Sequence, residues 1–194
     1  MIEQFKPIEL KLKGLLDSER FEHTIGVAHT AACMAMCYGE DVERAYQTGL
    51  LHDCGKYYKK DEFVKVCQEN NVPISDFEYE NPALLHAKLG AHYARTVYGV
   101  TDEEIISAIA YHTTGKPGMT VFEQIIYIAD YIEPCREVVP HQAEIRKMAF
   151  EDLDKCMVMI SKNTIDFLVS AGRPIDNITR DTYEYYKAKV EGHE

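Results

Sequence analysis

Helix start and stop signals recur along the whole chain, whereas the period-2 alternation between turn dipeptides that marks β-strands is absent. The chain has 194 residues, without an internal repeat or a shift in composition. A single hydrophobic core typically serves about 100–200 residues, and 46% of the residues here are hydrophobic. The sequence therefore predicts one all-α domain, a helical bundle.

The first two expected helices have clear boundaries. Ser18 can cap a helix that runs to Cys37 and ends near Gly39, with apolar residues on nearly every face. A helix that is apolar all round belongs in the middle of a bundle. Asp41 can cap the next helix, and Gly55 is placed to end it.

The middle of the chain is expected to hold shorter helices. Asp61 opens a short helix, and residues 70–80 are expected to form a loop. Asn81 followed by Pro82 is a strong helix start, and this helix should stop at Gly99. The next two helices begin with capping-box patterns, Thr101 with Glu104 and Thr120 with Glu123.

Two further helices are expected at the C-terminal end. One long amphipathic helix should run from about residue 143 to Ala171, because Gly172 and Pro174 form a stop signal. Thr179 is expected to begin the last helix.

The charge balance limits the possible partners. Lys and Arg number 21 against 32 Asp and Glu, which gives a formal net charge of −11. Nucleic acid polymers are usually held by basic stripes, so a broad surface for DNA or RNA is not expected. The acidic balance still allows a small ligand in a local pocket.

The termini, apolar stretches and cysteines indicate a soluble, cytoplasmic protein. The N-terminus lacks the apolar segment of a signal peptide, and the longest apolar stretches are too short or too charged to span a membrane. None of the six cysteines forms a C-x-x-C pair, so a zinc ribbon or a thioredoxin-type site has no support. Free thiols in a reducing cytosol are expected.

Four histidines lie at the middle or inner end of apolar helices: His23, His52, His86 and His112. One such histidine alone is most often a core residue bonded to a backbone carbonyl. Two acids share the setting, Asp53 and Asp130, and the nearest basic neighbour of Asp130 in sequence, Arg136, comes only after Pro134. Since buried charges are usually paired or coordinate metals, a metal site is the simplest explanation for these four histidines and two aspartates.

The ligand types narrow the choice of metal. Imidazole and carboxylate without thiolate suit iron, manganese, zinc, nickel or cobalt, among which geometry decides. The adjacent pair His52 and Asp53 alone is a weak sign of a site. The ordered set of six, spread over different expected helices, is a much stronger one.

The segments around these residues resemble the HD-domain metal-dependent phosphohydrolases. Within that superfamily the chain is similar to the YqeK-type symmetrical bis(5'-nucleosyl)-tetraphosphatases, in the blocks RFEHTIGVA, LLHDCGK, NPALLHAKLGA, AIAYHTTGKPGM and YIADYIEPCRE. The tail AGRPIDNITRDTYEYY is also similar. The resemblance implies a single HD domain over residues 1–194, with a metal-site core of about 18–136 on which C-terminal helices of residues 143–191 pack.

The resemblance also implies a ligand set and an activity. A metal, iron in this subfamily, as one ion or two, would be held by His23, His52, Asp53 and Asp130. His86 and His112 would either bind a second metal bridged by Asp53 or contact the substrate phosphates, and we favour the phosphate contact. The expected reaction is attack of metal-held hydroxide on a central phosphorus of diadenosine tetraphosphate, which gives two ADP.

Further residues in or near these blocks are candidates for contact with the nucleotide. Beside Asp53, the catalytic candidate is Lys56, which either reaches a phosphate or is a solvated lysine at a helix end. The remaining candidates for substrate binding are Arg136, Arg173 and Arg180, by bidentate contacts, and Thr113 and Gly26, by close approach.

Two alternatives to this reaction remain open. The same chemistry could act on another nucleotide, either a nucleoside phosphate or guanosine tetraphosphate. A protein of this kind could also be a nucleotide-binding sensor without turnover. The products released from diadenosine tetraphosphate distinguish these possibilities, and a homodimer remains possible in each.

Overall fold

The computed structural model describes residues 2–136 and 139–192. Within these ranges every regular element is a helix, so the predicted all-α class is confirmed. The α-helices are α1 (Lys6–Leu15), α2 (Ser18–Tyr38), α3 (Val42–Leu51), α4 (Phe63–Glu69), α5 (Asp76–Glu80), α6 (Leu85–Thr96), α7 (Glu103–Tyr111), α8 (Val121–Ile132), α9 (Gln142–Met148), α10 (Leu153–Ser170) and α11 (Asn177–Glu191). Two 3-10 helices, η1 (Ile2–Phe5) and η2 (Pro82–Leu84), precede α1 and α6.

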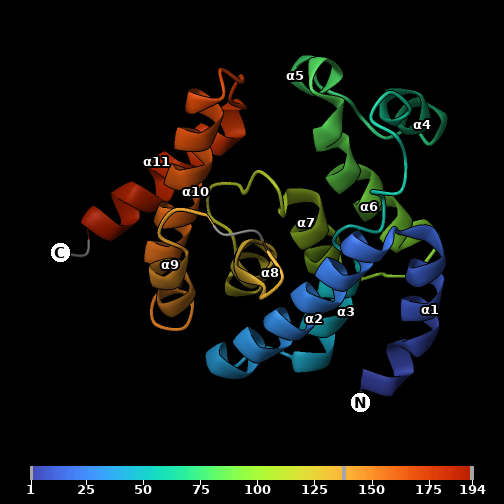
Figure 1. Ribbon diagram of the computed structural model, residues 1–194, viewed down its shortest axis with the longest axis horizontal. Helices are drawn as coiled ribbons and strands as arrows, with labels where there is room; N and C mark the ends of the chain where they lie inside the picture. Colours follow the sequence, from blue (N-terminus) through green and yellow to red (C-terminus); the bar gives the residue numbers. More distant parts are fainter. Residues whose placement is uncertain (1, 137–138, 193–194) are drawn as a thin grey trace.

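The helices surround a central pair. Figure 1 shows α7 and α8 in the middle, with α10 and α11 to one side and α4, α5 and α6 to the other. Helix α2 packs along α3 and against α8, and α10 packs against α8 and α11. The C-terminal helices therefore complete the same bundle.

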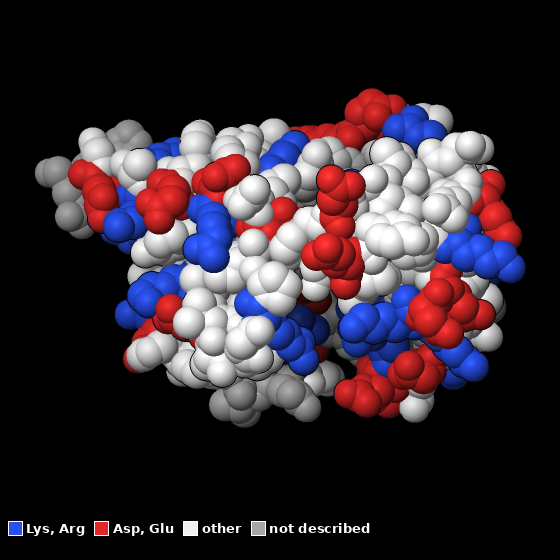
Figure 2. Space-filling view, turned by 90° about the horizontal axis from the view of Figure 1, so that it is seen from above, with Lys and Arg blue, Asp and Glu red and all other residues white. Residues whose placement is uncertain are grey.

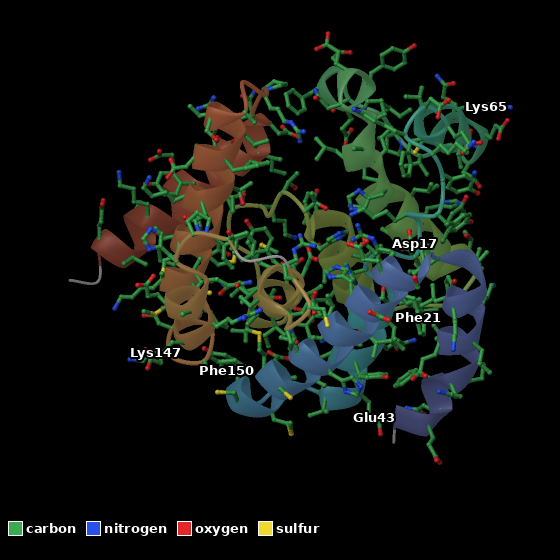
Figure 3. All side chains as sticks on the ribbon, viewed as in Figure 1. Asp17, Phe21, Glu43, Lys65, Lys147 and Phe150 are labelled. Carbon is green, nitrogen blue, oxygen red and sulfur yellow. The ribbon has the colours of Figure 1, made fainter. Side chains whose placement is uncertain are left out.

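Helix α8, rather than α2, is the most completely enclosed element. All of α8 from Phe122 to Ala129 is buried, whereas α2 leaves one face exposed, including Cys33 and Met36. Apolar residues on this outer face made α2 resemble an enclosed helix. The C-terminal end of α2 contacts the turn that follows α9. There the Tyr38 hydroxyl donates to the Ala149 carbonyl at 2.9 Å, beside Phe150 (Figure 3).

Some expected helix starts are confirmed. Asp41 accepts a hydrogen bond from the Arg44 amide, and Thr120 with Glu123 forms a complete capping box. The start expected at Asn81 differs, because the chain first makes one 3-10 turn and the Asn81 side chain donates to the Phe77 carbonyl instead of capping.

Three expected helix starts are wrong, and in each case an aspartate is the cap. Asp17 caps α2 in place of Ser18, and Asp102 caps α7 in place of Thr101. Asp176 caps α11, which begins at Asn177 and not at Thr179. A carboxylate accepts the free amides of the first turn and also complements the positive end of the helix dipole. The charged aspartate side chain therefore caps the helix in preference to the neighbouring serine or threonine hydroxyl.

Other boundaries also differ from the expectation. The long helix expected over residues 143–171 is broken at residues 149–152, and Asp152 caps α10 by accepting from the Lys155 amide. Helix α1 was not predicted. The loop expected over residues 70–80 contains α5, which begins with a capping box of Ser75 and Glu78. In the described ranges no helix is long and apolar enough to cross a membrane.

A close approach of two glycines brings α3 to α6. A Cβ on Gly55 would lie 2.7 Å from the Gly90 amide nitrogen and 2.8 Å from the His86 carbonyl oxygen. Because Gly55 has no side chain, the turn after α3 can lie directly against α6. That turn carries His52 and Asp53, and α6 carries His86.

Candidate metal centre

The four expected metal ligands and the two further histidines, His86 and His112, meet at the centre of the bundle. His23 comes from α2, His52 and Asp53 from the turn after α3, His86 from α6, His112 from the end of α7 and Asp130 from α8. The four histidines and Asp53 are all buried. Five separate parts of the chain therefore supply one cluster.

Asp53 divides this cluster into two groups. Its Oδ2 atom lies 3.5 Å from His52 Nε2 and 4.0 Å from His23 Nε2. On the same side, Asp130 Oδ1 lies 3.0 Å from His23 Nε2 and 3.8 Å from His52 Nε2. The first group is therefore two imidazoles and two carboxylates.

The other oxygen of Asp53 faces the second group. Asp53 Oδ1 lies 3.4 Å from His86 Nε2 and 3.5 Å from His112 Nε2. The Thr113 hydroxyl lies 3.1 Å from each of these two nitrogens. The second group therefore consists of two imidazoles, one carboxylate oxygen and one hydroxyl.

Each of the four rings is oriented by a hydrogen bond from Nδ1. His52, His86 and His112 donate to the carbonyl oxygen three residues earlier, at 2.6, 2.5 and 2.7 Å. His23 instead pairs with Glu133 Oε1 at 3.0 Å. Because a carbonyl oxygen can only accept, Nδ1 must carry the proton in those three rings, and Nε2 is left to face the centre.

These donors fit a bound cation. His23 Nε2 lies 3.3 Å from His52 Nε2, and His86 Nε2 lies 3.2 Å from His112 Nε2. In each pair two Nε2 atoms thus face each other, and a cation between them would satisfy both lone pairs. Among the described residues, Asp53 Oδ1 is buried and accepts no hydrogen bond, which is costly unless an ion binds there.

The electrostatics of the centre keep its carboxylates ionised. Burial alone would raise the pKa of Asp53, but the imidazoles of His52 and His112 that face it and the charge of Lys56 hold it well below its usual range. The pKa of Asp130 is also lowered, because the bond with His23 and the charge of Arg136 outweigh burial. Burial, with the charge of Lys56, lowers the pKa of His86 to about 3.

Three cations surround these carboxylates. Arg20 Nη1 donates to Asp53 Oδ2 at 2.9 Å, and Lys56 Nζ lies 3.5 Å from the same oxygen. Arg136 Nη1 lies 3.6 Å from Asp130 Oδ1. Asp130 therefore has a basic partner, which the sequence did not indicate because Arg136 follows Pro134; the turn after α8 folds back and returns it to the site.

The other predicted substrate contacts have different positions. Gly26 packs against Glu133, so close that a Cβ there would overlap the carboxylate; its contact with the nucleotide stays a prediction. Arg173 and Arg180 are exposed and lie outside the cluster, with the Arg173 guanidinium 5.8 Å from the centre of the Phe167 ring. Sequence reasoning missed Arg20 and Glu133, although both stand in the blocks that it singled out.

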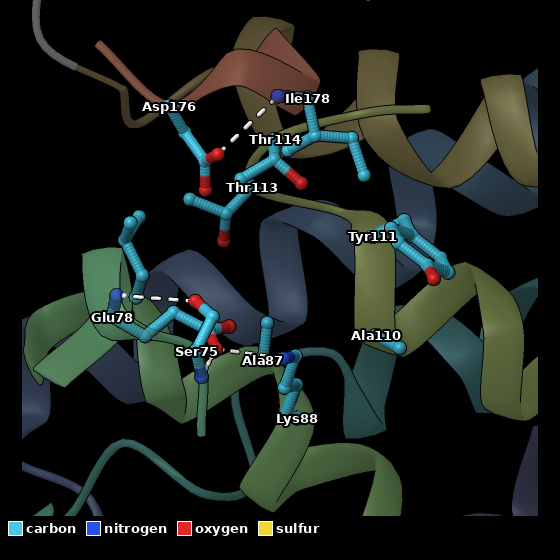
Figure 4. Close-up of a pocket in the computed structure, with 11 residues that line it drawn as sticks. Ser75, Glu78, Ala87, Lys88, Ala110, Tyr111, Thr113, Thr114, Asp176 and Ile178 are labelled. Carbon is cyan, nitrogen blue, oxygen red and sulfur yellow. Dashed lines mark hydrogen bonds and ion pairs between the residues drawn. The ribbon is translucent and has the colours of Figure 1, made fainter. Parts of the chain in front are cut away.

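Three hollows adjoin the centre. One of about 460 Å³ is lined by Arg20, His23 and Arg136, and one of about 190 Å³ by His112, Asp130 and Arg136. A third, of about 200 Å³, lies between α5, α6 and the start of α11 and is lined by Lys88, Thr113 and Asp176 (Figure 4). Arg136 borders the first two and Thr113 the last two, so the hollows are neighbours.

Comparisons with known proteins show the family of this chain. The family model of the HD domain matches residues 20–135. A symmetrical bis(5'-nucleosyl)-tetraphosphatase of Bacillus subtilis (strain 168) is 38% identical over 174 residues, 90% of this chain and 92% of that protein. A protein of the same name from Staphylococcus aureus (strain NCTC 8325 / PS 47) is 36% identical over 176 residues, 90% of each chain.

A solved structure extends the likeness to the fold. The crystal structure of an HD superfamily hydrolase from Clostridium acetobutylicum, described as involved in NAD metabolism, aligns with a TM-score of 0.91 and 38% identity. The alignment covers 95% of this chain and 97% of that one. This chain therefore belongs to the HD-domain family and, within it, to the family of symmetrical bis(5'-nucleosyl)-tetraphosphatases.

Proposed function

We propose that this protein is a metal-dependent hydrolase that cleaves diadenosine tetraphosphate symmetrically into two ADP. Relatives named for symmetrical cleavage of such substrates share 36% and 38% identity with it over 90% of its length. The observation that carries the proposal is the position of Asp53, whose two carboxylate oxygens face two separate pairs of histidines. This is a carboxylate placed to share its charge between bound cations.

The proposed metal ligands are His23, His52, Asp53 and Asp130. Iron is the proposed metal, and the same donors would also accept manganese, cobalt, nickel or zinc. When bound, such an ion lowers the pKa of water from 15.7 toward about 7 and neutralises phosphate charge. The chain contributes the orientation of the rings, since each Nδ1 hydrogen bond turns Nε2 toward the centre.

His86 and His112 fit a second cation better than a direct phosphate contact. A phosphate oxygen needs a donor, yet both rings already donate from Nδ1 to a backbone carbonyl. The low pKa of His86 leaves a lone pair on its Nε2 at neutral pH. We therefore propose that His86 and His112 would hold a second ion together with Asp53, in place of the phosphate contact that we favour from the sequence alone.

Arg20, Lys56 and Arg136 are proposed to receive the phosphate chain. Each now lies within 3.6 Å of a carboxylate oxygen of Asp53 or Asp130. Phosphate oxygens can replace these carboxylates as partners, with bidentate contacts from the arginines and a point charge from Lys56 near the leaving oxygen. Because in-line transfer at phosphorus depends mainly on positioning and charge, these cations are the main catalytic side chains outside the ligands.

The hollows on the two sides of the centre suit a substrate with a nucleoside at each end. One ADP unit would extend past Arg136 into the larger hollow, and the other past Thr113 toward the start of α11. Arg173 and Arg180 lie in the chain on either side of Asp176, which lines the hollow at the start of α11. They are therefore proposed to grip the second unit.

A small nucleotide suits this protein better than a nucleic acid polymer. Acidic and basic side chains are interspersed over the face seen in Figure 2, and the chain as a whole carries a net charge of −11. The three exposed cysteines, Cys33, Cys37 and Cys135, are free thiols, which supports the proposed cytoplasmic location. A homodimer stays a prediction.

Product analysis tests the proposed reaction. Purified protein loaded with iron or manganese should convert diadenosine tetraphosphate to ADP alone, separated by anion-exchange chromatography. Asp53→Ala should abolish turnover, while Lys65→Ala, at an exposed position of α4, should not. Release of AMP with ATP, or binding without turnover, would contradict the proposal. Faster cleavage of guanosine tetraphosphate or a nucleoside phosphate would favour the alternative substrates.

A further inference from the structure

Glu133 is a fully buried acid beside the metal centre. It follows the last residue of α8 and has 0% of its surface exposed. A buried carboxylate is costly unless its oxygens are paired. Here both oxygens are paired, since Oε1 lies 3.0 Å from His23 Nδ1 and Oε2 accepts from the Cys135 amide at 2.7 Å.

The environment of Glu133 is built to hold this carboxylate in place. Gly26, one turn after His23 on α2, packs directly against the carboxylate, and a Cβ at that position would overlap Oε2. From α9, Arg146 donates to the backbone carbonyls of Ile132 and Glu133, each at 2.9 Å. The turn after α8 is therefore fixed from two directions.

His23 differs from the other three histidines in how its ring is held. His52, His86 and His112 are oriented by a neutral carbonyl three residues earlier on their own segment. His23 is oriented by a charged side chain from a residue 110 positions away. Its other nitrogen faces Asp130 Oδ1 at 3.0 Å, so residues one helical turn apart contact both nitrogens of its ring.

We infer that Glu133 is the positioning residue for His23, and that Gly26 is glycine so that the Glu133 carboxylate can reach the ring. The inference rests on the proposed function, in which His23 is a metal ligand. The Glu133 carboxylate accepts the Nδ1 proton, which directs the Nε2 lone pair to the metal and strengthens the imidazole as a donor. A charged acceptor does this more strongly than the carbonyls that hold the other three rings.

Metal affinity is the first measurement. Glu133→Ala should weaken metal binding by about 10- to 100-fold, the usual effect of losing such a partner, in a competition titration with a chromophoric chelator. Glu133→Gln keeps the size and an accepting oxygen and should recover most of this loss. Gly26→Ala should reproduce the Glu133→Ala defect, because it displaces the carboxylate.

Two control variants separate positioning from general damage. Glu123→Gln alters another buried acid of α8, which contacts Ser107 and Lys116 instead of a ligand. Gly14→Ala adds a methyl group where no atom lies within 4 Å. Both should bind metal as the unsubstituted protein does, and circular dichroism should show that every variant is folded.

Nitrogen NMR of the zinc-loaded protein reports the state of the ring directly. His23 should show a protonated Nδ1 with a low-field proton signal and a metal-bound Nε2. The signal should persist in Glu133→Gln and disappear in Glu133→Ala. Unchanged affinity and an unchanged His23 signal in Glu133→Ala would overturn the inference. Failure of the unsubstituted protein to bind metal would instead overturn the proposed metal site itself.

Discussion

Arg20 donates from Nη1 to Asp53 Oδ2 at 2.9 Å, so the first turn of α2 brings a guanidinium to the carboxylate that faces both histidine pairs. Asp17 fixes that turn by accepting from the Arg20 amide at 2.8 Å. The Arg20 side chain is 29% exposed and lines the largest of the three hollows. It therefore contacts both the buried centre and the space open to a ligand.

Arg20→Ala should lower kcat/KM for diadenosine tetraphosphate by about tenfold to a hundredfold, because a hydrogen bond to a charged group contributes about 1.5–3 kcal/mol. The metal content should not fall, since Arg20 is not a ligand. Steady-state kinetics and elemental analysis of the same sample check both expectations. Loss of metal without a change in the kinetics of reloaded protein would contradict the role given to Arg20.

Asp130→Ala should remove bound metal, because it takes away the carboxylate nearest to His23 Nε2. Elemental analysis after purification measures this directly. His92→Ala is a suitable control, since His92 lies on α6 but packs beside Tyr93 instead of the centre. Full metal content in the Asp130 variant would remove Asp130 from the ligand set.

The ion pairs of Arg44 should make stability depend on pH. Arg44 bonds to Asp102 at 2.7 Å and to Glu104 at 2.6 Å, and these bonds lower the pKa of both carboxyls, with burial opposing the effect at each. The unfolded chain therefore binds protons at a higher pH than the folded chain. The stabilisation is complete above the unfolded pKa values of about 4 and is lost as the pH falls through the lower folded values.

Arg44→Met should thus lower Tm at pH 6, and the difference from the unsubstituted protein should shrink as the pH falls below about 4. Thermal melts between pH 3 and pH 7 test this. A difference that is the same at every pH would mean that Arg44 acts only through its packing over the Phe122 ring, 4.0 Å away.

Lys116 is paired with a buried acid, and its loss should be costly. Its Nζ lies 2.7 Å from Glu123 Oε1, and the Glu123 side chain is 3% exposed. Lys116→Ala leaves that carboxylate buried without its cation, which should cost about 1–3 kcal/mol of unfolding free energy in urea denaturation. Lys65→Ala breaks an exposed pair with Glu69 and should cost at most about 1 kcal/mol. Equal costs would contradict the structural role of Lys116.

Thiol labelling checks the burial of the cysteines. Cys33, Cys37 and Cys135 are exposed, whereas Cys54, Cys67 and Cys156 are buried. Burial raises the pKa of Cys67 to about 11 and also raises that of Cys54, so few thiolates are available there. Iodoacetamide should label three cysteines in the native protein and six in urea, as counted by mass spectrometry. Rapid native labelling of Cys54 would contradict the packing of its turn on α6.

The sequence predicted the six residues of the centre because their chemistry conflicts with their surroundings. A histidine or aspartate among apolar helical residues can be recognised from the sequence alone, as His112 and Asp130 illustrate. Their partners are less visible, since an arginine in the first turn of a helix and a glutamate before a proline are ordinary in sequence. Arg20 and Glu133 gain their roles only from contacts across 33 and 110 residues.

Helix existence was easier to predict than helix boundaries. The interruption between α9 and α10 lies inside a continuous amphipathic pattern, and only the cap by Asp152 shows where the second helix begins. The competition between Asp17 and Ser18 for one cap depends on which side chain reaches the first free amides. Such local competition is decided by backbone geometry, which periodicity alone does not contain.

The contact between His23 and Glu133 joins residues 110 positions apart, and α8 is the last of the helices to reach the centre. While the chain is being synthesised, His23, His52, His86 and His112 all emerge before Asp130 and Glu133. The nascent protein therefore exposes imidazoles without the acids that complete their set. The complete set of proposed ligands therefore exists only once α8 has been synthesised, while α9, α10 and α11, which complete the bundle, still follow in the chain.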